Sequence, residues 1–99
     1  MDIELIKKLC KGLGVIKKFS KNYEFFGNVE LEIETPHKTV LSIISDRGIF
    51  SCYVVKKTIL HNRLVPVDRI IKCNKNATFN SLEATIDYLK NHLEKIEEN

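Results

Sequence analysis

Several motifs that identify enzymes or metal proteins are absent from this chain. It has no Gly-rich loop opening a helix, no His-x-x-His pair and no traceable Ser, His and Asp arrangement, which argues against phosphate-transfer, zinc and triad chemistry. It also lacks an apolar run of about 18 residues, the length that a membrane-spanning helix needs. No apolar segment of the kind found in secretory signals follows the N-terminus. The sequence therefore predicts a cytoplasmic protein that is not an enzyme and has no cofactor, metal ion or membrane partner.

Cysteines are few, and their spacing does not suggest disulfides or metal binding. Cys10, Cys52 and Cys73 are odd in number, lie far apart and include no C-x-x-C pair, so they cannot form a fully paired disulfide framework or a typical zinc site. We expect reduced thiols that pack as small apolar side chains. The alternative is a nucleophilic thiol activated by one of the chain's three histidines. These are His37, His61 and His92.

Length and charge predict one domain over residues 1–99 with patches of both signs. A chain of this size buries roughly two thirds of its unfolded surface, which allows one core. The net charge is +3, and it alternates along the chain. Two blocks are basic: residues 1–22 contain six Lys and two acids (+4), and residues 47–75 contain seven Lys or Arg and one acid (+6). Two blocks are acidic: residues 23–46 contain one Lys and five acids (−4), and residues 76–99 contain two Lys and five acids (−3). Such alternation argues against a nucleic-acid partner, which prefers one uniformly basic surface.

The N-terminal segment has the spacing of an amphipathic helix. Its apolar residues recur at steps of three and four, with most lysines on the other side. They are Ile3, Ile6, Leu9, Cys10, Leu13 and Ile16. Gly12 and Gly14 each weaken a helix by up to about 1 kcal/mol, so we expect it to end or loosen near residue 13 and to resume as a turn before Phe19, with Lys18 among its lysines. Residues 20–22 are predicted as a connector, and residues 23–26 are apolar enough to return to the core.

The centre of the chain predicts a β-meander. In Val29–Glu34 apolar residues alternate with glutamates, as in a strand with one face in the core and one in water. Pro36 ends this strand because it has no N–H for a ladder. Two further β-rich runs, Thr39–Ser45 and Ile49–Val55, are joined by Ser45–Gly48, a tight hairpin turn. We therefore expect three antiparallel strands.

The C-terminal part predicts a short helix and a long one. Thr58–Leu60 fits either the end of the third strand or a short fourth strand. Residues 66–73 are predicted to form a helix that begins at Pro66, and residues 74–78 a loop. Asn80 is a candidate N-cap, with Glu83 as its reciprocal partner. The closing helix has an apolar stripe at 4-3-4-3 spacing. The stripe is Leu82, Ile86, Leu89, Leu93 and Ile96. About two heptads are fewer than a coiled coil needs, so we expect a monomer, with a homodimer through this helix as the alternative.

Together these elements predict an α+β fold. Its order is an N-terminal helix, a three-stranded antiparallel β-meander, a short helix and a long C-terminal helix. Because each element has one strongly apolar side, both long helices should pack on the sheet face of Val29, Leu31 and Ile33.

The segment Leu41–Gly48, with the Pro-led short helix and the closing Leu89-x-x-x-Leu93-x-x-Ile96 pattern, resembles small bacterial immunity proteins. These proteins neutralise polymorphic toxins, including those of contact-dependent growth inhibition systems. The resemblance covers about residues 38–97. It implies a protein that binds a cognate toxin domain in the cytoplasm and occludes its active site or substrate surface.

The candidate toxin-binding residues are the acidic row of the first predicted strand and the turn after the second. They are Glu30, Glu32, Glu34, Asp46 and Arg47. Many such toxins are nucleases with basic clefts, and the three glutamates repeat at roughly 7 Å, comparable to phosphates along a strand. The positive net charge points the other way. The simpler interpretation is a solvated strand face whose glutamates pair with Lys38 or Lys56.

A different class of function also remains open. A small nucleic-acid-binding or protein-interaction module would use the basic N-terminal helix, together with the basic block of residues 47–75. Single-strand binding also needs interleaved aromatic residues, and only Tyr53 qualifies in that block.

Overall fold

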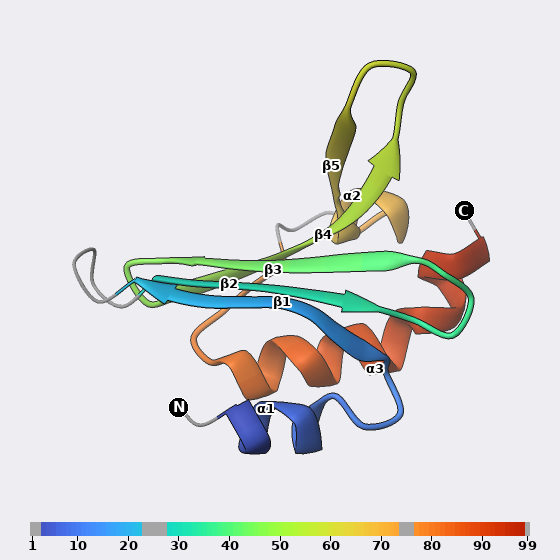
Figure 1. Ribbon diagram of the computed structural model, residues 1–99. Coiled ribbons are helices and arrows are strands. Elements are labelled where there is room, and N and C mark those ends of the chain that lie inside the picture. The colour runs from blue at the N-terminus through green and yellow to red at the C-terminus, as the bar shows by residue number, and fades with distance from the viewer. Residues whose placement is uncertain (1–2, 23–27, 74–76, 99) are drawn as a thin grey trace.

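The computed structural model describes residues 3–22, 28–73 and 77–98. These residues form an α+β fold with one antiparallel sheet of six strands (Figure 1). The elements in chain order are α1 (Ile3–Leu9), β1 (Val15–Asn22), β2 (Asn28–Glu34), β3 (Val40–Asp46), β4 (Ile49–Lys57), β5 (Asn62–Pro66), α2 (Val67–Ile70), β6 (Thr78–Phe79) and α3 (Leu82–Glu98).

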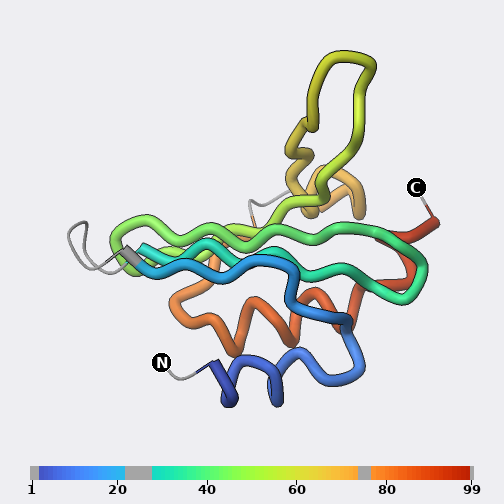
Figure 2. Tube along the Cα trace, in the orientation of Figure 1, coloured from blue at the N-terminus to red at the C-terminus, as the bar shows by residue number. Residues whose placement is uncertain are grey.

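Two helices cover one face of the sheet. Figures 1 and 2 show α1 and α3 side by side beneath the strands. The third helix, α2, lies by β4 and β5, and no helix among the described residues covers β1, β2 and β3 on the other side. The core forms between these layers. It includes Ile6, Leu31, Ile33, Leu41, Ile43, Ile86 and Leu89, all at most 1% exposed. The prediction that both long helices share the sheet face of Leu31 and Ile33 is confirmed, and Val29 packs at the margin of this core.

The predicted length of the first helix is wrong. The α1 helix ends at Leu9, and residues 15–22, assigned to its last turns and a connector, form strand β1. Gly12 has a φ of +88°, a left-handed conformation that ends the helix. Beyond it, Val15 and Ile16 are β-branched and pair with Glu34 and Ile33 of β2. The core positions predicted for residues 23–26 lie outside the described residues.

The predicted meander is the centre of a larger sheet. Strands β2, β3 and β4 match the three expected strands, but the sheet order is β1-β2-β3-β4-β5, with β6 also paired to β4. Thr58–Leu60 is neither the end of β4 nor a fourth strand, because it belongs to the loop between β4 and β5. Strand β5 begins at Asn62 and pairs back along β4 as far as Tyr53.

The predicted closing helix is confirmed, but its cap is wrong. The hydroxyl of Ser81, not the side chain of Asn80, accepts a hydrogen bond from the N–H of Ala84 at 3.1 Å. The apolar stripe lies on the sheet, with four of its five members buried and Leu93 packed at the margin. The short helix after Pro66 is also present, although it is only four residues long.

Candidate binding surface

The sheet face opposite the helices is open, and its register arranges side chains in rows across the strands. One row runs through Val15, Glu34, Val40, Val55 and Leu64, and the next through Lys18, Glu32, Ser42, Tyr53 and Pro66. A third contains Glu30, Ile44 and Ser51. We call this surface the open face. It is acidic along β2 and largely apolar along β3, β4 and β5, a combination suited to binding a protein.

The three predicted glutamates lie together on the open face, as the alternation indicated. Glu30 forms an ion pair with Lys18 of β1 at 3.1 Å, and Glu34 forms one with Lys38 at 3.4 Å. The ion pair of Glu34 with Lys38 was expected. The ion pair of Glu30 with Lys18 was not, because the sequence prediction placed Lys18 in the first helix. Glu32 makes no ion pair with any residue that the structure describes. Surface pairs of this kind contribute only about 0–1 kcal/mol, so the row keeps most of its acidic character.

Asp46 and Arg47 lie at one end of the same face, in the turn between β3 and β4. Arg47 and Gly48 both have positive φ, 53° and 80°, as the central residues of a type I′ hairpin turn do. The N–H of Arg47 donates to the side-chain oxygen of Asn28 at 3.2 Å, which ties the turn to the start of β2. The five predicted residues therefore occupy one rigid surface.

An apolar hollow lies next to the acidic row. It has a volume of about 320 Å³ and is lined by Ile44, Asp46, Ile49, Ser51 and Tyr53. Ile49 is 51% exposed at its edge. The sequence singled out Asp46 as a candidate toxin-binding residue and Tyr53 as an aromatic residue of the basic block, but it did not predict a hollow between them. The signal was that the second and third predicted strands have apolar residues on both faces, which leaves one apolar set without a covering helix among the described residues.

The second unpredicted feature is a hairpin that leaves the sheet. The far half of β4 and all of β5 stand up on the side of the open face (Figure 1). The hairpin loop is Thr58–His61, and its tip residues Ile59 and Leu60 are 102% and 87% exposed. The basic block of the sequence contributes Lys56, Lys57 and Arg63 to its strands.

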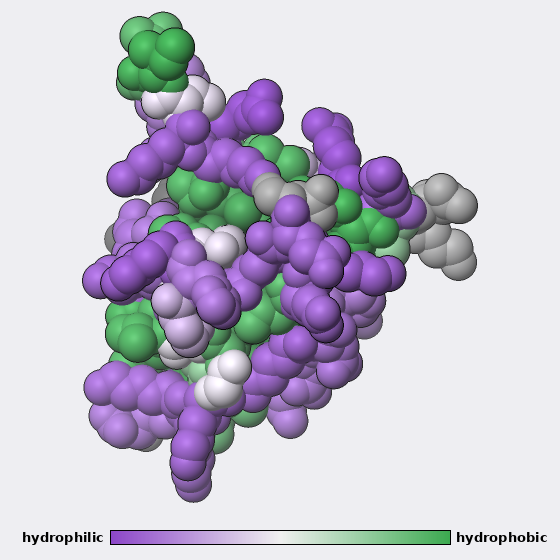
Figure 3. Space-filling view, turned by 90° about the vertical axis from the view of Figure 1, so that its right-hand side faces the viewer, coloured by the Kyte–Doolittle hydropathy of each residue, from purple (hydrophilic) through white to green (hydrophobic). Residues whose placement is uncertain are grey.

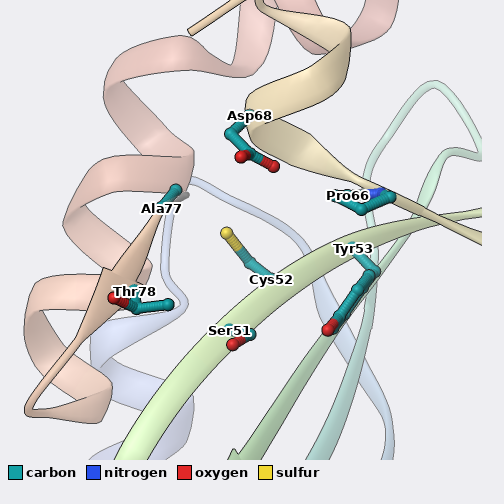
Figure 4. A pocket seen from close by; sticks show the side chains of 7 residues that line it. All are labelled: Ser51, Cys52, Tyr53, Pro66, Asp68, Ala77 and Thr78. Atoms are coloured by element: carbon teal, nitrogen blue, oxygen red, sulfur yellow. The ribbon is translucent and has the colours of Figure 1, made fainter. Parts of the chain in front are cut away.

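A smaller pocket lies at the sheet edge, between β4, α2 and β6. It has a volume of about 180 Å³, and the sulfur of Cys52 and the carboxylate of Asp68 point into it (Figure 4). Burial, and then the charge of Asp68, raise the pKa of Cys52 to about 12. Because the thiolate is the reactive form, this thiol is inert at neutral pH.

The other thiols have no histidine as a partner within the described ranges. Cys10 is buried, and burial raises its pKa. Cys73 is exposed and lies 3.9 Å from the hydroxyl of Tyr88, whose ring stacks on His92. Burial and the contact with Cys73 raise the pKa of Tyr88. Among the described residues, no group of three or more His, Cys, Asp or Glu is placed to hold a metal ion.

No helix of the described chain is both long and apolar enough to cross a membrane. Comparisons with protein-family models, curated proteins and solved structures found no match to this chain.

Proposed function

We propose that this protein is an immunity protein that binds a cognate toxin domain through its open face. The observation that carries the proposal is the row of Glu30, Glu32 and Glu34, which lies on a β-strand in the interior of the sheet. None of the helices that the structure describes covers this row. Binding there needs little ordering of the backbone, because β2 is hydrogen-bonded to strands on both sides. The row and the adjacent hollow offer a basic protein both charge and apolar contact.

The proposed mechanism is occlusion of a basic substrate surface. Carboxylates at a spacing of roughly 7 Å would occupy positions that phosphates take in a nuclease cleft. Attraction between opposite charges mainly raises the association rate, and apolar contact at the centre slows dissociation. In this proposal Glu32 is the first residue to test, because it has no intramolecular ion pair among the described residues and lies at the centre of the row.

The α1 helix offers less support to the alternative module. It is seven residues long with two lysines, and Lys7 pairs with Glu4 at 3.6 Å. Lys18, also assigned to this helix, lies on β1 and pairs with Glu30. A basic helix surface of this size provides few phosphate contacts.

The test uses a purified toxin domain encoded in a neighbouring reading frame, and compares Glu32→Lys with a matched control, Glu94→Lys. Both side chains belong to regular elements, but Glu94 is exposed on α3, which covers the other face of the sheet. We expect Glu32→Lys to slow association about tenfold or more at low salt and to reduce protection of toxin-expressing cells. Glu94→Lys should behave as the parent.

If the parent and Glu32→Lys bind the toxin domain equally well, the open face is not the toxin-binding surface. Loss of binding in Glu94→Lys alone would move the contact surface to α3. Absence of any toxin binding by the parent chain would refute the immunity function itself.

A further inference from the structure

The hairpin of β4 and β5 is a rigid ribbon that projects beyond the rest of the fold (Figures 1 and 2). Its two strands pair without interruption from Tyr53 and Pro66 to Lys57 and Asn62. The loop is closed at its base, because the N–H of Thr58 donates to the carbonyl oxygen of His61 at 2.9 Å and the N–H of His61 donates to the hydroxyl of Thr58 at 3.1 Å. The tip is therefore held in a defined position.

The end of this ribbon is apolar. Ile59 and Leu60 are the most exposed large hydrophobic side chains of the described residues, at 102% and 87%. Figure 3 shows the hydrophobic tip raised above hydrophilic side chains. Each aliphatic side chain of this size gains about 1.5–3 kcal/mol when it is fully buried. Burial of this apolar tip in a groove of a partner would therefore contribute to binding.

The flanks of the ribbon are basic. No Asp or Glu occurs from Ile49 to Val67, and Lys56, Lys57 and Arg63 lie on the two strands. Lys56 is directly opposite Arg63, whereas Lys57 is one residue further and faces the other side of the ribbon. Placing two like charges directly opposite each other costs stability. At the base of the ribbon Lys56 and Lys57 line a hollow together with Glu97 of α3, which offsets part of this charge. Positive side chains are nevertheless present on both faces of the ribbon, which favours an anionic partner that contacts both faces.

We infer that the β4–β5 hairpin is a DNA-binding ribbon that enters a groove of duplex DNA. A two-stranded ribbon fits the major groove, which is about 8.5 Å deep, and the minor groove is about 7.5 Å deep. Lys56 and Ile59 are three residues apart, roughly 10 Å along an extended strand. The tip can therefore reach the base edges while Lys56, Lys57 and Arg63 lie beside the phosphates of the two DNA backbones that border the groove.

The apolar tip adds a specific action. Leucine and isoleucine side chains inserted between base steps unstack them and kink the duplex. We therefore expect Ile59 and Leu60 to bend DNA, and the basic flanks to supply affinity. The acidic row lies on β2, separated from β4 by β3, so the raised hairpin can approach phosphates while the row stays away from them. The alternation of charge along the sequence argued against a nucleic-acid partner, but the fold places part of the basic block of residues 47–75 on one projecting hairpin. This inference goes beyond toxin binding and does not depend on it.

The first experiment measures binding of the full chain to a 24-base-pair duplex by fluorescence anisotropy at several salt concentrations. Three phosphate contacts predict a slope of about −2.7 for log K against log salt. Affinity should then fall about 40-fold between 50 and 200 mM salt. Lys57→Glu with Arg63→Glu should weaken binding at least about tenfold at 50 mM salt, because it removes two of these contacts.

The matched control is Lys8→Glu with Lys11→Glu, which changes the net charge equally at two exposed residues near the N-terminus. It should leave DNA binding within about twofold of the parent. Ile59→Ser with Leu60→Ser should bind DNA with the same salt dependence as the parent. It should no longer bend the duplex, which is measured as the change in energy transfer between dyes attached to the two duplex ends.

Three results would overturn the inference. They are no binding to the duplex at 50 mM salt, equal losses in the hairpin and control variants, and binding to vesicles of phosphatidylserine and phosphatidylcholine without binding to DNA. The last would assign the wedge to a membrane surface. Circular dichroism of every variant separates loss of binding from loss of folding. Failure here leaves toxin binding by Glu32 untouched, since that test uses other residues and another partner.

Discussion

The two faces of the sheet carry different chemistry on the same strands. On β2, Leu31 and Ile33 are fully buried under the helices, whereas Glu30, Glu32 and Glu34 alternate with them on the open face. The covered face can bury side chains because α1 and α3 bring apolar stripes of their own. No such layer covers the open face over β1, β2 and β3 within the described part of the chain. The buried apolar core is therefore on one side of these strands, and the side chains proposed to bind a partner are on the other.

This comparison indicates that substitutions on the two faces should affect different properties. A covered residue contributes burial and packing, so its loss should unfold the protein. An open-face residue contributes less burial, so its loss should leave the fold intact, and in the proposed function it would affect partner binding instead.

The largest effect is expected for Leu89→Ala, at the centre of the α3 stripe. Leu89 is 0% exposed, and removing a large buried side chain loses transfer energy and leaves a cavity. The free energy of unfolding should fall by about 2–5 kcal/mol. Urea titration measures this value. A decrease below about 1 kcal/mol would mean that the stripe is loosely packed, and would favour a homodimer through this helix.

A smaller loss is expected for Gly14→Ala, where the chain passes from α1 into β1. A Cβ atom there would lie 2.3 Å from the carbonyl oxygen of Glu34 and 2.8 Å from its carbon. These are backbone atoms of a paired strand, so the clash must move the backbone, at a cost of about 1–3 kcal/mol. Lys11→Ala, at an exposed residue, is the control and should stay within about 0.5 kcal/mol of the parent.

Stability should also fall at alkaline pH. In the folded protein burial keeps Cys52 protonated, with a pKa of about 12, whereas a thiol of the unfolded chain ionises near 8.5. The unfolded state therefore releases its proton first, and the free energy of unfolding falls as pH rises from about 8.5 towards 12. Urea midpoints at pH 7, 9 and 10.5 measure this effect. Cys52→Val should flatten the dependence, and a profile identical to the parent would exclude Cys52 as a cause.

The smallest effect on folding is expected for Glu30→Lys combined with Glu32→Lys on the open face. Glu30 and Glu32 are half-buried and lie outside the core. Surface substitutions away from the core usually change stability by under about 0.5 kcal/mol each, and the pair of Glu30 with Lys18 adds about 0–1 kcal/mol. The thermal midpoint should therefore move by only a few degrees. Differential scanning calorimetry checks this. A shift as large as that of Leu89→Ala would show that the acidic row is structural, and would weaken the distinction between the faces.

The sequence by itself determined the elements whose pattern has one interpretation. Alternation in Val29–Glu34 identified both the buried and the acidic side of β2, because a strand repeats every two residues. The Asp46–Gly48 turn and the α3 stripe were equally clear, since local turn chemistry and a 3.6-residue period decide them. Of the candidate toxin-binding residues, Glu30, Glu32 and Glu34 follow from this alternation and Asp46 and Arg47 from the turn, and the structure brings them onto one surface.

Tertiary structure decided the rest. Ile16 fits either a helix stripe or a strand, and only pairing with Ile33 of β2 makes it part of β1. Lys18 became a partner of Glu30 for the same reason. Thr58–Leu60, with the tip residues Ile59 and Leu60, fitted either the end of a strand or a short strand of its own. Sequence does not show whether such an apolar run is covered by another part of the chain. Burial and strand pairing depend on residues distant in the chain, so only the assembled sheet determines which apolar side chains are in the core and which remain exposed for a partner.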